Sequence, residues 1–524
     1  MPGFQDRWEG SGRRAKIDRK RLASGTISVN RAGLLSSPCT FPDLVGSWFP
    51  PTSREDEEPS VIPTDGKHAR RRSPWPIALG AGVLAIVLVA GIMVYAAMRT
   101  KERSVFKGSE VATKAPTEPA PQLSEPPALD NWPRWGITHT QYSADNEPQD
   151  VVDQARGVLG RVPMLQNQHI MGWGVGNPEP SPGQFNFVDL DRRLTFMASS
   201  RAVPVITLCC APDWMKGGQA GRTDWSKNHT VAPEREHFDD FAKLAARVAK
   251  QYPTVKHYMV WNEFKGFWDP ATNRWDAEAY TEMYNKVYTA LKKVNKDIQV
   301  GGPYVSISSS TRTEGPPSEL TGPWGTVDQR ALDAVKYWIQ HKKGADFIVV
   351  DGASMTNDKG NVPNDFAAQG KFSAITTWLR EESDDLPVWW AEWYVEPENA
   401  QWSEEKRTAV QAAALMEFAK SGVTTALYWN PQQKGEGECP GCLWSPKMGG
   451  ELPMAGLLSG FTKWFPNGVE VREVETSDPK VKAMGQASQV VMVNTSDQDV
   501  SATVDGRPVT LKPYEIKWSG RGGA

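Results

Sequence analysis

The chain has 524 residues, a formal net charge of −3 at pH 7 and 22 tryptophans. A chain of this length can bury a large core and can hold more than one domain. There is no basic excess of the kind that binds nucleic acid, so we expect no nucleic-acid partner. The many tryptophans suit the flat apolar faces of sugars, although large cores also use this residue.

The N-terminal quarter of the chain has the pattern of a membrane anchor. Residues 1–74 are rich in Arg, Pro, Ser and acidic residues without an apolar period, which predicts a disordered cytoplasmic segment. The uncharged run that follows exceeds the roughly 20 residues that cross a bilayer, so we predict a transmembrane helix over 75–98. Residues 99–130 are proline-rich and predict a stalk. We therefore expect a single-pass plasma-membrane protein, with the lipid bilayer as a partner and the remainder of the chain outside.

The orientation depends on how the basic residues are distributed. Basic residues at 67 and 70–72 precede the apolar run and favour a cytoplasmic N-terminus. Arg99 and Lys101 flank the other end, and residues 94–96 (Val-Tyr-Ala) could serve as a cleavage site that releases the protein. Release remains an alternative to a permanent anchor.

From residue 131 onward, short apolar strands alternate with helical patterns. This alternation predicts an α/β fold, a (β/α)8 TIM barrel over 131–450. The predicted strands are Trp135–Thr140, Val162–Trp173, Val203–Cys210, Val255–Glu263, Ile298–Val305, Phe347–Asp351, Leu386–Glu392 and Thr424–Asn430. Helices are expected over Glu236–Gln251 and Ala277–Val294. The tail has short strands and a turn at Asp505-Gly506, which predicts a small antiparallel β domain over 451–524.

Two of the predicted strands end on a carboxylate. The fourth ends in Trp261-Asn262-Glu263, and the seventh ends on Glu392, about three βα units further along. A lone Glu at a strand end is as often a solvated or capping residue as a catalytic one. Two of them at one end of a barrel form the pair that retaining glycoside hydrolysis needs. We therefore expect Glu263 to be the acid/base and Glu392 the nucleophile.

Further residues at strand ends are candidates for binding a sugar. Asn262 could donate to the 2-hydroxyl group of the sugar, and Trp429 could form the floor beneath the ring, with a core tryptophan as the rival interpretation. Other candidate binding residues are Trp173, Asp213, Trp214, Tyr304 and Asp351. His139 and His169 are more often core histidines in such places. Trp261 and Phe264, and Trp390 and Trp393, could wall the two carboxylates and raise the pKa of the acid.

The five cysteines give no zinc pattern, and we expect no metal and no organic cofactor. Cys439 and Cys442 are spaced for a local disulfide if this part of the chain lies outside the cell. Cys209 and Cys210 are expected to be buried free thiols.

Several stretches together resemble clan A of the glycoside hydrolases, and within it family 39 and its xylosidase-like, membrane-anchored actinobacterial relatives. These stretches are 173–185, 211–215, 261–268, 300–304 and 390–393. The resemblance implies a retaining β-glycosidase without cofactor, with Glu263 as acid/base, Glu392 as nucleophile and Asn262 on the 2-hydroxyl group.

The sequence departs from the pattern of clan A at two positions. Phe264 stands where the clan usually has proline, and Asp351 stands where relatives often have His or Tyr. The expected substrate is an oligo- or polysaccharide of a cell wall or plant, with xylose- or arabinose-type sugars first. The alternatives are a catalytically inactive carbohydrate-binding receptor and a sensor on a barrel scaffold.

Overall fold

The computed structural model describes residues 121, 123, 133–312, 315–357, 364–397, 400–429 and 439–521. The predicted segments 1–74 and 75–98, and nearly all of the stalk, lie outside these residues. Across the described part of the chain, no helix has the length and apolar character that a membrane span requires.

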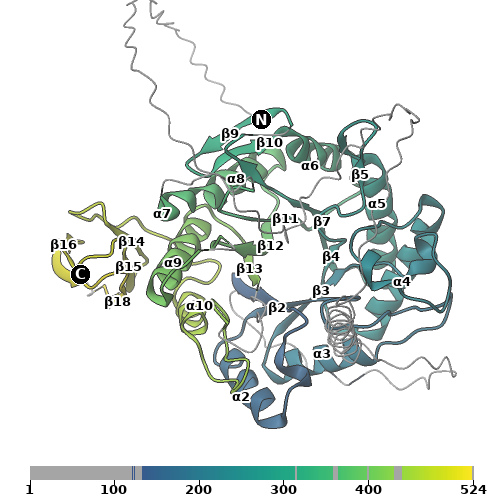
Figure 1. Cartoon of the computed structure of the whole chain (residues 1–524), viewed down its shortest axis with the longest axis horizontal. Coiled ribbons are helices and arrows are strands. Elements are labelled where there is room, and N and C mark those ends of the chain that lie inside the picture. The colour runs from purple at the N-terminus through teal and green to yellow at the C-terminus, as the bar shows by residue number, and fades with distance from the viewer. Residues whose placement is uncertain are drawn as a thin grey trace, which may run out of the picture. The chain divides into compact units, whose positions relative to one another are not determined.

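Eight parallel strands close into a barrel, with the helices around it (Figure 1). Around the ring the order is β1-β13-β12-β11-β7-β4-β3-β2, which is the order of a TIM barrel. The strands are β1 (Trp135–Thr138), β2 (Leu165–His169), β3 (Val203–Leu208), β4 (His257–Val260), β7 (Gln299–Ser306), β11 (Phe347–Ala353), β12 (Val388–Tyr394) and β13 (Thr425–Trp429). Each coincides with a predicted strand, so the predicted barrel is confirmed.

Helices cover the outside of the barrel and pack their apolar faces on the strands. They are α2 (Gln149–Leu159), α3 (Val188–Ser199), α4 (Phe238–Gln251), α5 (Ala277–Val294), α6 (Gln329–His341), α7 (Asp365–Ala368), α8 (Gly370–Glu382), α9 (Glu404–Lys420) and α10 (Pro453–Trp464). Short 3-10 turns span Ala144–Asn146, Asp213–Met215, Trp225–Lys227 and Arg235–His237. Asp276 caps α5 by accepting from the Ala279 amide, and α5 has the predicted bounds.

The inside of the barrel is filled by apolar side chains from its strands. Leu165, Val205, Val349 and Leu427 belong to this cluster, which is separate from the core between strands and helices. On β1 the inward position is Gly136, where a Cβ atom would lie 2.2 Å from the Leu165 carbonyl oxygen. Only glycine leaves room for the neighbouring strand here.

A polar layer lies closer to the carboxyl ends of the strands. The Thr207 hydroxyl donates to Asn167 Oδ1 at 2.8 Å, and Asn167 Nδ2 donates to Thr138 Oγ1 at 3.0 Å. The Thr138 hydroxyl then donates to the Ala391 carbonyl at 2.7 Å. This chain of bonds ties β3, β2 and β1 to β12 one residue before Glu392, and so stiffens the floor beneath the carboxylates.

Two small β elements are inserted after strands 4 and 5 of the barrel. A ribbon of β5 (Trp268–Asp269) and β6 (Arg274–Trp275) follows β4. A three-stranded sheet of β8 (Ser309–Ser310), β10 (Gly325–Asp328) and β9 (Pro317–Gly322) follows β7. β9 and β10 lie near α6 and α8 at the rim (Figure 1). Both insertions are on the side of the barrel where the carboxyl ends of the strands carry the candidate site.

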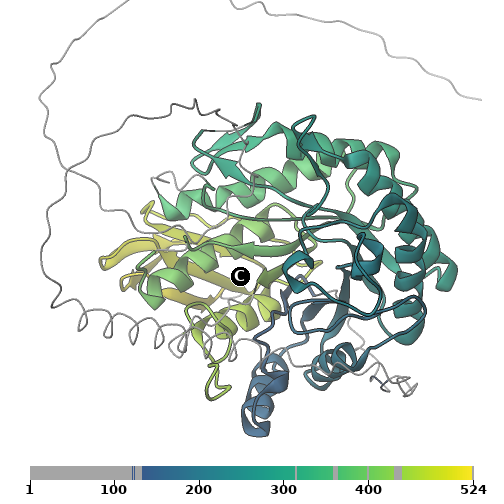
Figure 2. The ribbon, with the colours of Figure 1, turned by 45° about the vertical axis from the view of Figure 1, so that its right-hand side comes forward.

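The C-terminal strands form antiparallel sheets beside α9 and α10 (Figure 2). β14 (Val481–Gly485), β15 (Gln489–Asn494) and β18 (Ile516–Gly520) form one sheet, and β16 (Val500–Val504) pairs with β17 (Arg507–Leu511). The turn between β16 and β17 is Asp505-Gly506, with φ of +52° and +73° as a tight hairpin turn requires. Trp518 packs edge-on against Phe461 of α10, with ring centroids 5.4 Å apart. The predicted C-terminal strands are confirmed, and α10 precedes them.

Candidate active site

One β-bulge in β7 and one in β12, the strands on either side of β11, turn side chains into the barrel mouth. Between β11 and β7 the register skips Tyr304, and between β11 and β12 it skips Ala391. A bulge adds one residue and re-aims the side chains beside it. As a result, the Tyr304 hydroxyl donates to Glu392 Oε1 at 2.7 Å, while Asp351 of β11 lies in register with Glu392.

The loop after β4 has an unusual backbone. Trp261, Glu263 and Phe264 have φ of +70°, +51° and +55°, in the left-handed region that side chains rarely adopt. Proline cannot adopt such a φ, so this turn excludes proline at position 264. Trp261 Nε1 donates to the Lys265 carbonyl at 2.8 Å and closes this turn.

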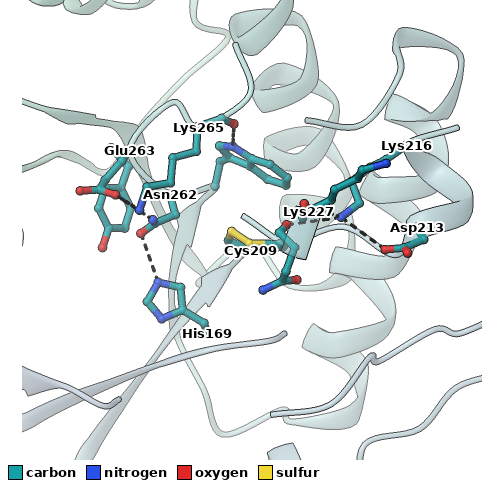
Figure 3. The surroundings of a disulfide bond; sticks show 12 residues. His169, Cys209, Asp213, Lys216, Lys227, Asn262, Glu263 and Lys265 are labelled. Atoms are coloured by element: carbon teal, nitrogen blue, oxygen red, sulfur yellow. Dashed lines mark hydrogen bonds and ion pairs between the residues drawn. A yellow bond between two sulfur atoms is a disulfide. The ribbon is translucent and has the colours of Figure 1, made fainter. Parts of the chain in front are cut away.

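Three carboxyl groups meet at the barrel mouth. One oxygen from each of Glu263, Asp351 and Glu392 lies within 4.8 Å of the others, and all three side chains are buried. The Lys265 ammonium contacts Glu263 Oε2, and Figure 3 shows it reaching across Asn262. Oxygens at this spacing can hold a divalent cation. In this cluster the Lys265 ammonium contributes positive charge.

The pKa values of the cluster differ strongly from one another. Burial raises the pKa of Glu392 to about 8, helped by Glu263 and opposed by Lys265 and the Tyr304 hydrogen bond. Burial and then Glu263 raise the pKa of Asp351 well above its ordinary value. Burial also raises the pKa of Glu263, but Lys265 and a hydrogen bond with Asp351 outweigh it and hold this pKa below its usual value. These shifts favour the protonated forms of Asp351 and Glu392 and the anion of Glu263.

The surroundings of Asp351 agree with a protonated carboxyl group. Within the described residues, no N–H group and no hydroxyl group donates a hydrogen bond to either buried oxygen of Asp351. An ionised Asp351 would leave both oxygens unpaired in the interior. A protonated Asp351 can instead donate to the neighbouring Glu263, which removes the repulsion between the two groups.

A hydrogen-bond chain reaches Glu263 from β2. His169 Nε2 lies 3.2 Å from Asn262 Oδ1, and Asn262 Nδ2 donates to Glu263 Oε2 at 3.2 Å. Burial lowers the pKa of His169 to about 3, so its ring is neutral and Nε2–H must be the donor to the amide oxygen. The chain orients Asn262 with its N–H groups toward the carboxylates.

Two of the predicted sugar-binding tryptophans lie beside this chain. The Trp173 ring stacks on His169 with centroids 4.0 Å apart and meets Trp429 edge-on at 6.5 Å. His229 completes the group at 5.7 Å from Trp173. Trp173 and Trp429 are half-buried, so part of each ring remains exposed at the mouth.

The structure does not bring Trp214 and Asp213 to the carboxylates. Trp214 Nε1 donates to the Glu179 carbonyl at 2.9 Å, and its ring meets His237. Asp213 pairs with Lys216 on the other side of Cys209 (Figure 3). His139 is a core histidine, as expected, and bonds to Ser143 and Gln166.

The prediction that four aromatic rings wall the carboxylates is wrong. Trp261 packs edge-on against Phe241, and Phe264 stacks on Tyr280 at 4.1 Å. Trp390 and Trp393 both pack on Phe372. These rings belong to the core between strands and helices. The carboxylates are instead surrounded by each other and by polar groups.

The two cysteine predictions had different outcomes. Cys439 and Cys442 form the predicted disulfide. Cys209 and Cys210 are buried, but they form a disulfide with each other, so the prediction of free thiols is wrong (Figure 3). Sequence alone could not show that two adjacent side chains turn toward each other at the end of β3.

Sequence reasoning missed three groups and undervalued a fourth. Lys265, His229 and Tyr394 were not predicted. Tyr394 belongs to the site, because burial and the three carboxyl groups raise its pKa well above the ordinary value. A strand histidine such as His169 is expected to be a core residue, whereas the structure bonds it to Asn262. The alternation from Leu165 through Asn167 points His169 into the barrel, and this signal could have found it.

The fold and the site define a (β/α)8 barrel with clustered carboxyl groups at the carboxyl ends of its strands. Residues 177–418 match the model of the Glycosyl hydrolases family 39. The chain is therefore similar to this family across most of the barrel.

Comparisons with whole proteins find similar solved structures, and the first two below support the fold alone. No curated protein matches the chain. SrfJ from Salmonella typhimurium is similar, with 13% identity and a TM-score of 0.51 over 75% of this chain and 90% of that chain. A conserved exported protein from Bacteroides fragilis has 11% identity and a TM-score of 0.50 over 76% and 98%. A GH39 β-xylosidase from Caulobacter crescentus has 17% identity and a TM-score of 0.46 over 73% and 81%.

Proposed function

We propose that this barrel is a retaining β-glycosidase in which Glu392 is the nucleophile and Glu263 the acid/base. The observation that carries the proposal is the distance between the two groups, whose nearest oxygens lie within 4.8 Å. Retaining enzymes hold their carboxyl groups about 5–5.5 Å apart, whereas inverting enzymes leave about 6.5–9.5 Å for a water molecule.

In the first step, the Glu392 carboxylate attacks the anomeric carbon, and the bond to the leaving oxygen breaks. The proton of Glu263 goes to that oxygen, which leaves as an alcohol, and the sugar remains as an ester on Glu392. In the second step, the Glu263 carboxylate takes a proton from water, whose oxygen attacks the anomeric carbon. The ester bond breaks, and Glu392 leaves as a carboxylate.

Neighbouring residues support these roles. Tyr304 donates to Glu392 and favours its anion, which both steps require at the nucleophile. Asn262 is held by His169 with its N–H groups toward the cluster, where one can meet the 2-hydroxyl group of the sugar. Trp173 and Trp429 offer exposed ring area for stacking.

The substrate we propose is an oligo- or polysaccharide of a cell wall or plant, with a xylose- or arabinose-type sugar first. The match to family 39 supports a carbohydrate substrate. The choice of sugar comes from the resemblance of the sequence motifs alone.

The test is hydrolysis of a panel of aryl β-glycosides by the full chain, beside Glu392→Ala and the surface control Glu404→Ala. We expect turnover that disappears in Glu392→Ala and persists in the control. A mechanism-based fluorosugar should label Glu392, as identified by peptide mass. Unchanged turnover in Glu392→Ala would contradict the assignment.

A second candidate is a carbohydrate-binding protein without catalysis. One observation favours it: the Lys265 ammonium contacts Glu263 and lowers the pKa of its carboxyl group, although the first step needs a proton there. Binding of polysaccharide without turnover or labelling would support this alternative.

We also propose that residues 75–98 anchor the protein in the plasma membrane with the barrel outside. The uncharged run of the sequence supports the anchor, and two disulfides suit an oxidising compartment. Protease added to intact cells should remove the barrel and leave residues 1–74 protected. A barrel that resists protease until the cells are lysed would contradict this topology.

A further inference from the structure

Lys265 lies in direct contact with the residue that we propose as acid/base. It follows Glu263 by two positions, and its ammonium reaches Glu263 Oε2. Its side chain is 18% exposed, and Asp351 and Glu392 lie close enough to act on its charge. A lysine so placed changes which carboxyl group of the cluster holds a proton.

The backbone positions Lys265 firmly. The left-handed φ of Phe264 turns the chain back toward the site, and its ring is anchored on Tyr280. Trp261 Nε1 holds the Lys265 carbonyl at 2.8 Å. Gly266 has a φ of +83° and packs against the backbone of a neighbouring loop, so the turn cannot relax on that side.

Several titratable groups face the cluster from the surrounding elements. They are Glu263 and Lys265 after β4, Tyr304 on β7, Asp351 on β11, Glu392 and Tyr394 on β12, His169 on β2, His229 after β3, and Lys371 on α8. Burial lowers the pKa values of His169 and His229, so both rings are neutral at pH 7. Lys371 donates to the Ala353 carbonyl at 2.7 Å, and burial lowers its pKa to about 7. Lys265 is thus the cation that touches Glu263 itself.

The two half-reactions of double displacement need opposite forms of Glu263. Bond cleavage needs its protonated form, and the attack by water needs its anion. A cation in contact with Glu263 favours the anion and so favours the second half-reaction.

We propose that Lys265 is a positioning residue that keeps Glu263 in its base form and leaves the cluster's protons on Asp351 and Glu392 until a glycoside enters. The proposal rests on the retaining mechanism proposed above. On substrate entry, one proton moves within the cluster from Glu392 to Glu263, so no proton is gained or lost. The reactive arrangement is therefore a minor protonation state of the empty site.

The test compares pH profiles of kcat/KM for the full chain and four variants. Lys265→Met and Lys265→Gln remove the cation, and Lys265→Arg retains it. As a control, Lys256→Met removes a lysine just before β4 whose ammonium donates to the Pro253 carbonyl. Loss of the cation raises the pKa values of both Glu263 and Glu392. We expect the whole bell-shaped profile to move to higher pH by about one unit in the two neutral variants. It should stay in place in Lys265→Arg and Lys256→Met.

A second readout does not depend on activity. The Glu263 carboxyl carbon, assigned by its loss in Glu263→Gln, can be titrated by 13C NMR in the wild type and in Lys265→Gln. We expect its pKa to rise by about one unit in the variant. Thermal melting identifies any variant that fails to fold.

The outcomes separate this proposal from the proposed function. An unchanged profile and an unchanged Glu263 titration in a folded neutral variant would overturn the role of Lys265. A wild type that neither hydrolyses glycosides nor accepts the fluorosugar would contradict the glycosidase instead, and the NMR titration would still decide on Lys265.

Discussion

The Tyr304 hydroxyl donates a hydrogen bond of 2.7 Å to Glu392 Oε1, from a residue that is itself completely buried. A bulge in β7 places the tyrosine, and a bulge in β12 places the glutamate. Both bulges lie beside β11, and together they bring the two side chains within hydrogen-bonding distance. It opposes the burial that raises the pKa of Glu392 to about 8.

Tyr304→Phe should therefore lower kcat/KM by about 10- to 100-fold, as expected for losing a hydrogen bond to a charged group worth about 1.5–3 kcal/mol. Because the bond favours the anion, its loss raises the pKa of Glu392 and moves the alkaline limb of the profile above pH 8. Tyr284→Phe removes a hydroxyl that bonds to the Gly344 carbonyl outside the site and serves as the control. An alkaline limb that moves equally in both variants would contradict this role.

Asn262→Ala should act on substrates that carry a 2-hydroxyl group. His169 orients the amide, and contacts to this hydroxyl strengthen in the transition state. We expect kcat/KM to fall by about 100-fold on ordinary glycosides and by much less on the matching 2-deoxy glycosides. Equal losses on both substrates would indicate that Asn262 only orders the loop.

His257 should make stability depend on pH. Burial lowers its pKa to about 3, below the 6.5 of an exposed histidine, so the unfolded chain binds a proton that the folded chain does not. Its contribution to stability is therefore lost as pH falls below about 6.5, by about 2 kcal/mol at pH 5.

Asp351 and Glu392 act in the opposite direction, since their raised pKa values favour the folded state as pH falls. The measurement is accordingly a difference: the free energy of unfolding in urea for His257→Phe minus that of the wild type. We expect this difference to become more favourable to the variant by about 2 kcal/mol from pH 7 to pH 5. His341→Gln, at an exposed position of α6, should show no such change.

Gly266→Ala should destabilise the loop after β4 more than a comparable glycine substitution elsewhere. Gly266 has a φ of +83°, and an added Cβ atom would lie 2.2 Å from the Ala232 nitrogen. Gly183 has a φ of +76° with nothing within 4 Å of such an atom. Gly183→Ala should cost about 1 kcal/mol from backbone conformation alone, and Gly266→Ala clearly more. Equal melting temperatures for the two variants would contradict the close packing.

Thiol titration checks the two disulfides. The chain has five cysteines, and four of them are paired in the structure. The denatured, unreduced protein should therefore react with thiol reagent at one position only, Cys39. If three thiols react and peptide mapping finds Cys209 and Cys210 among them, the disulfide between these two residues is contradicted.

Much of the fold could be read from the chain because local patterns specify it. Apolar strands of the right length alternate with helices, and α5 was predicted to the residue. The positions of Glu263 and Glu392 followed from their place at strand ends, since parallel strands of a barrel end on one side. The aromatic walls were misplaced because bulges and the left-handed turn change which side chains face inward.

The amino-acid pattern alone was enough to predict the barrel, its C-terminal strands and the positions of Glu263 and Glu392 at strand ends. Periodicity and chain order suffice for these, because they depend on neighbours along the chain. The contacts of Lys265 with Glu263, of Tyr304 with Glu392 and of Cys209 with Cys210 appear only in the tertiary structure. The pKa shifts of the three carboxyl groups depend on it as well, because burial and the distances between charges arise only when separate strands come together.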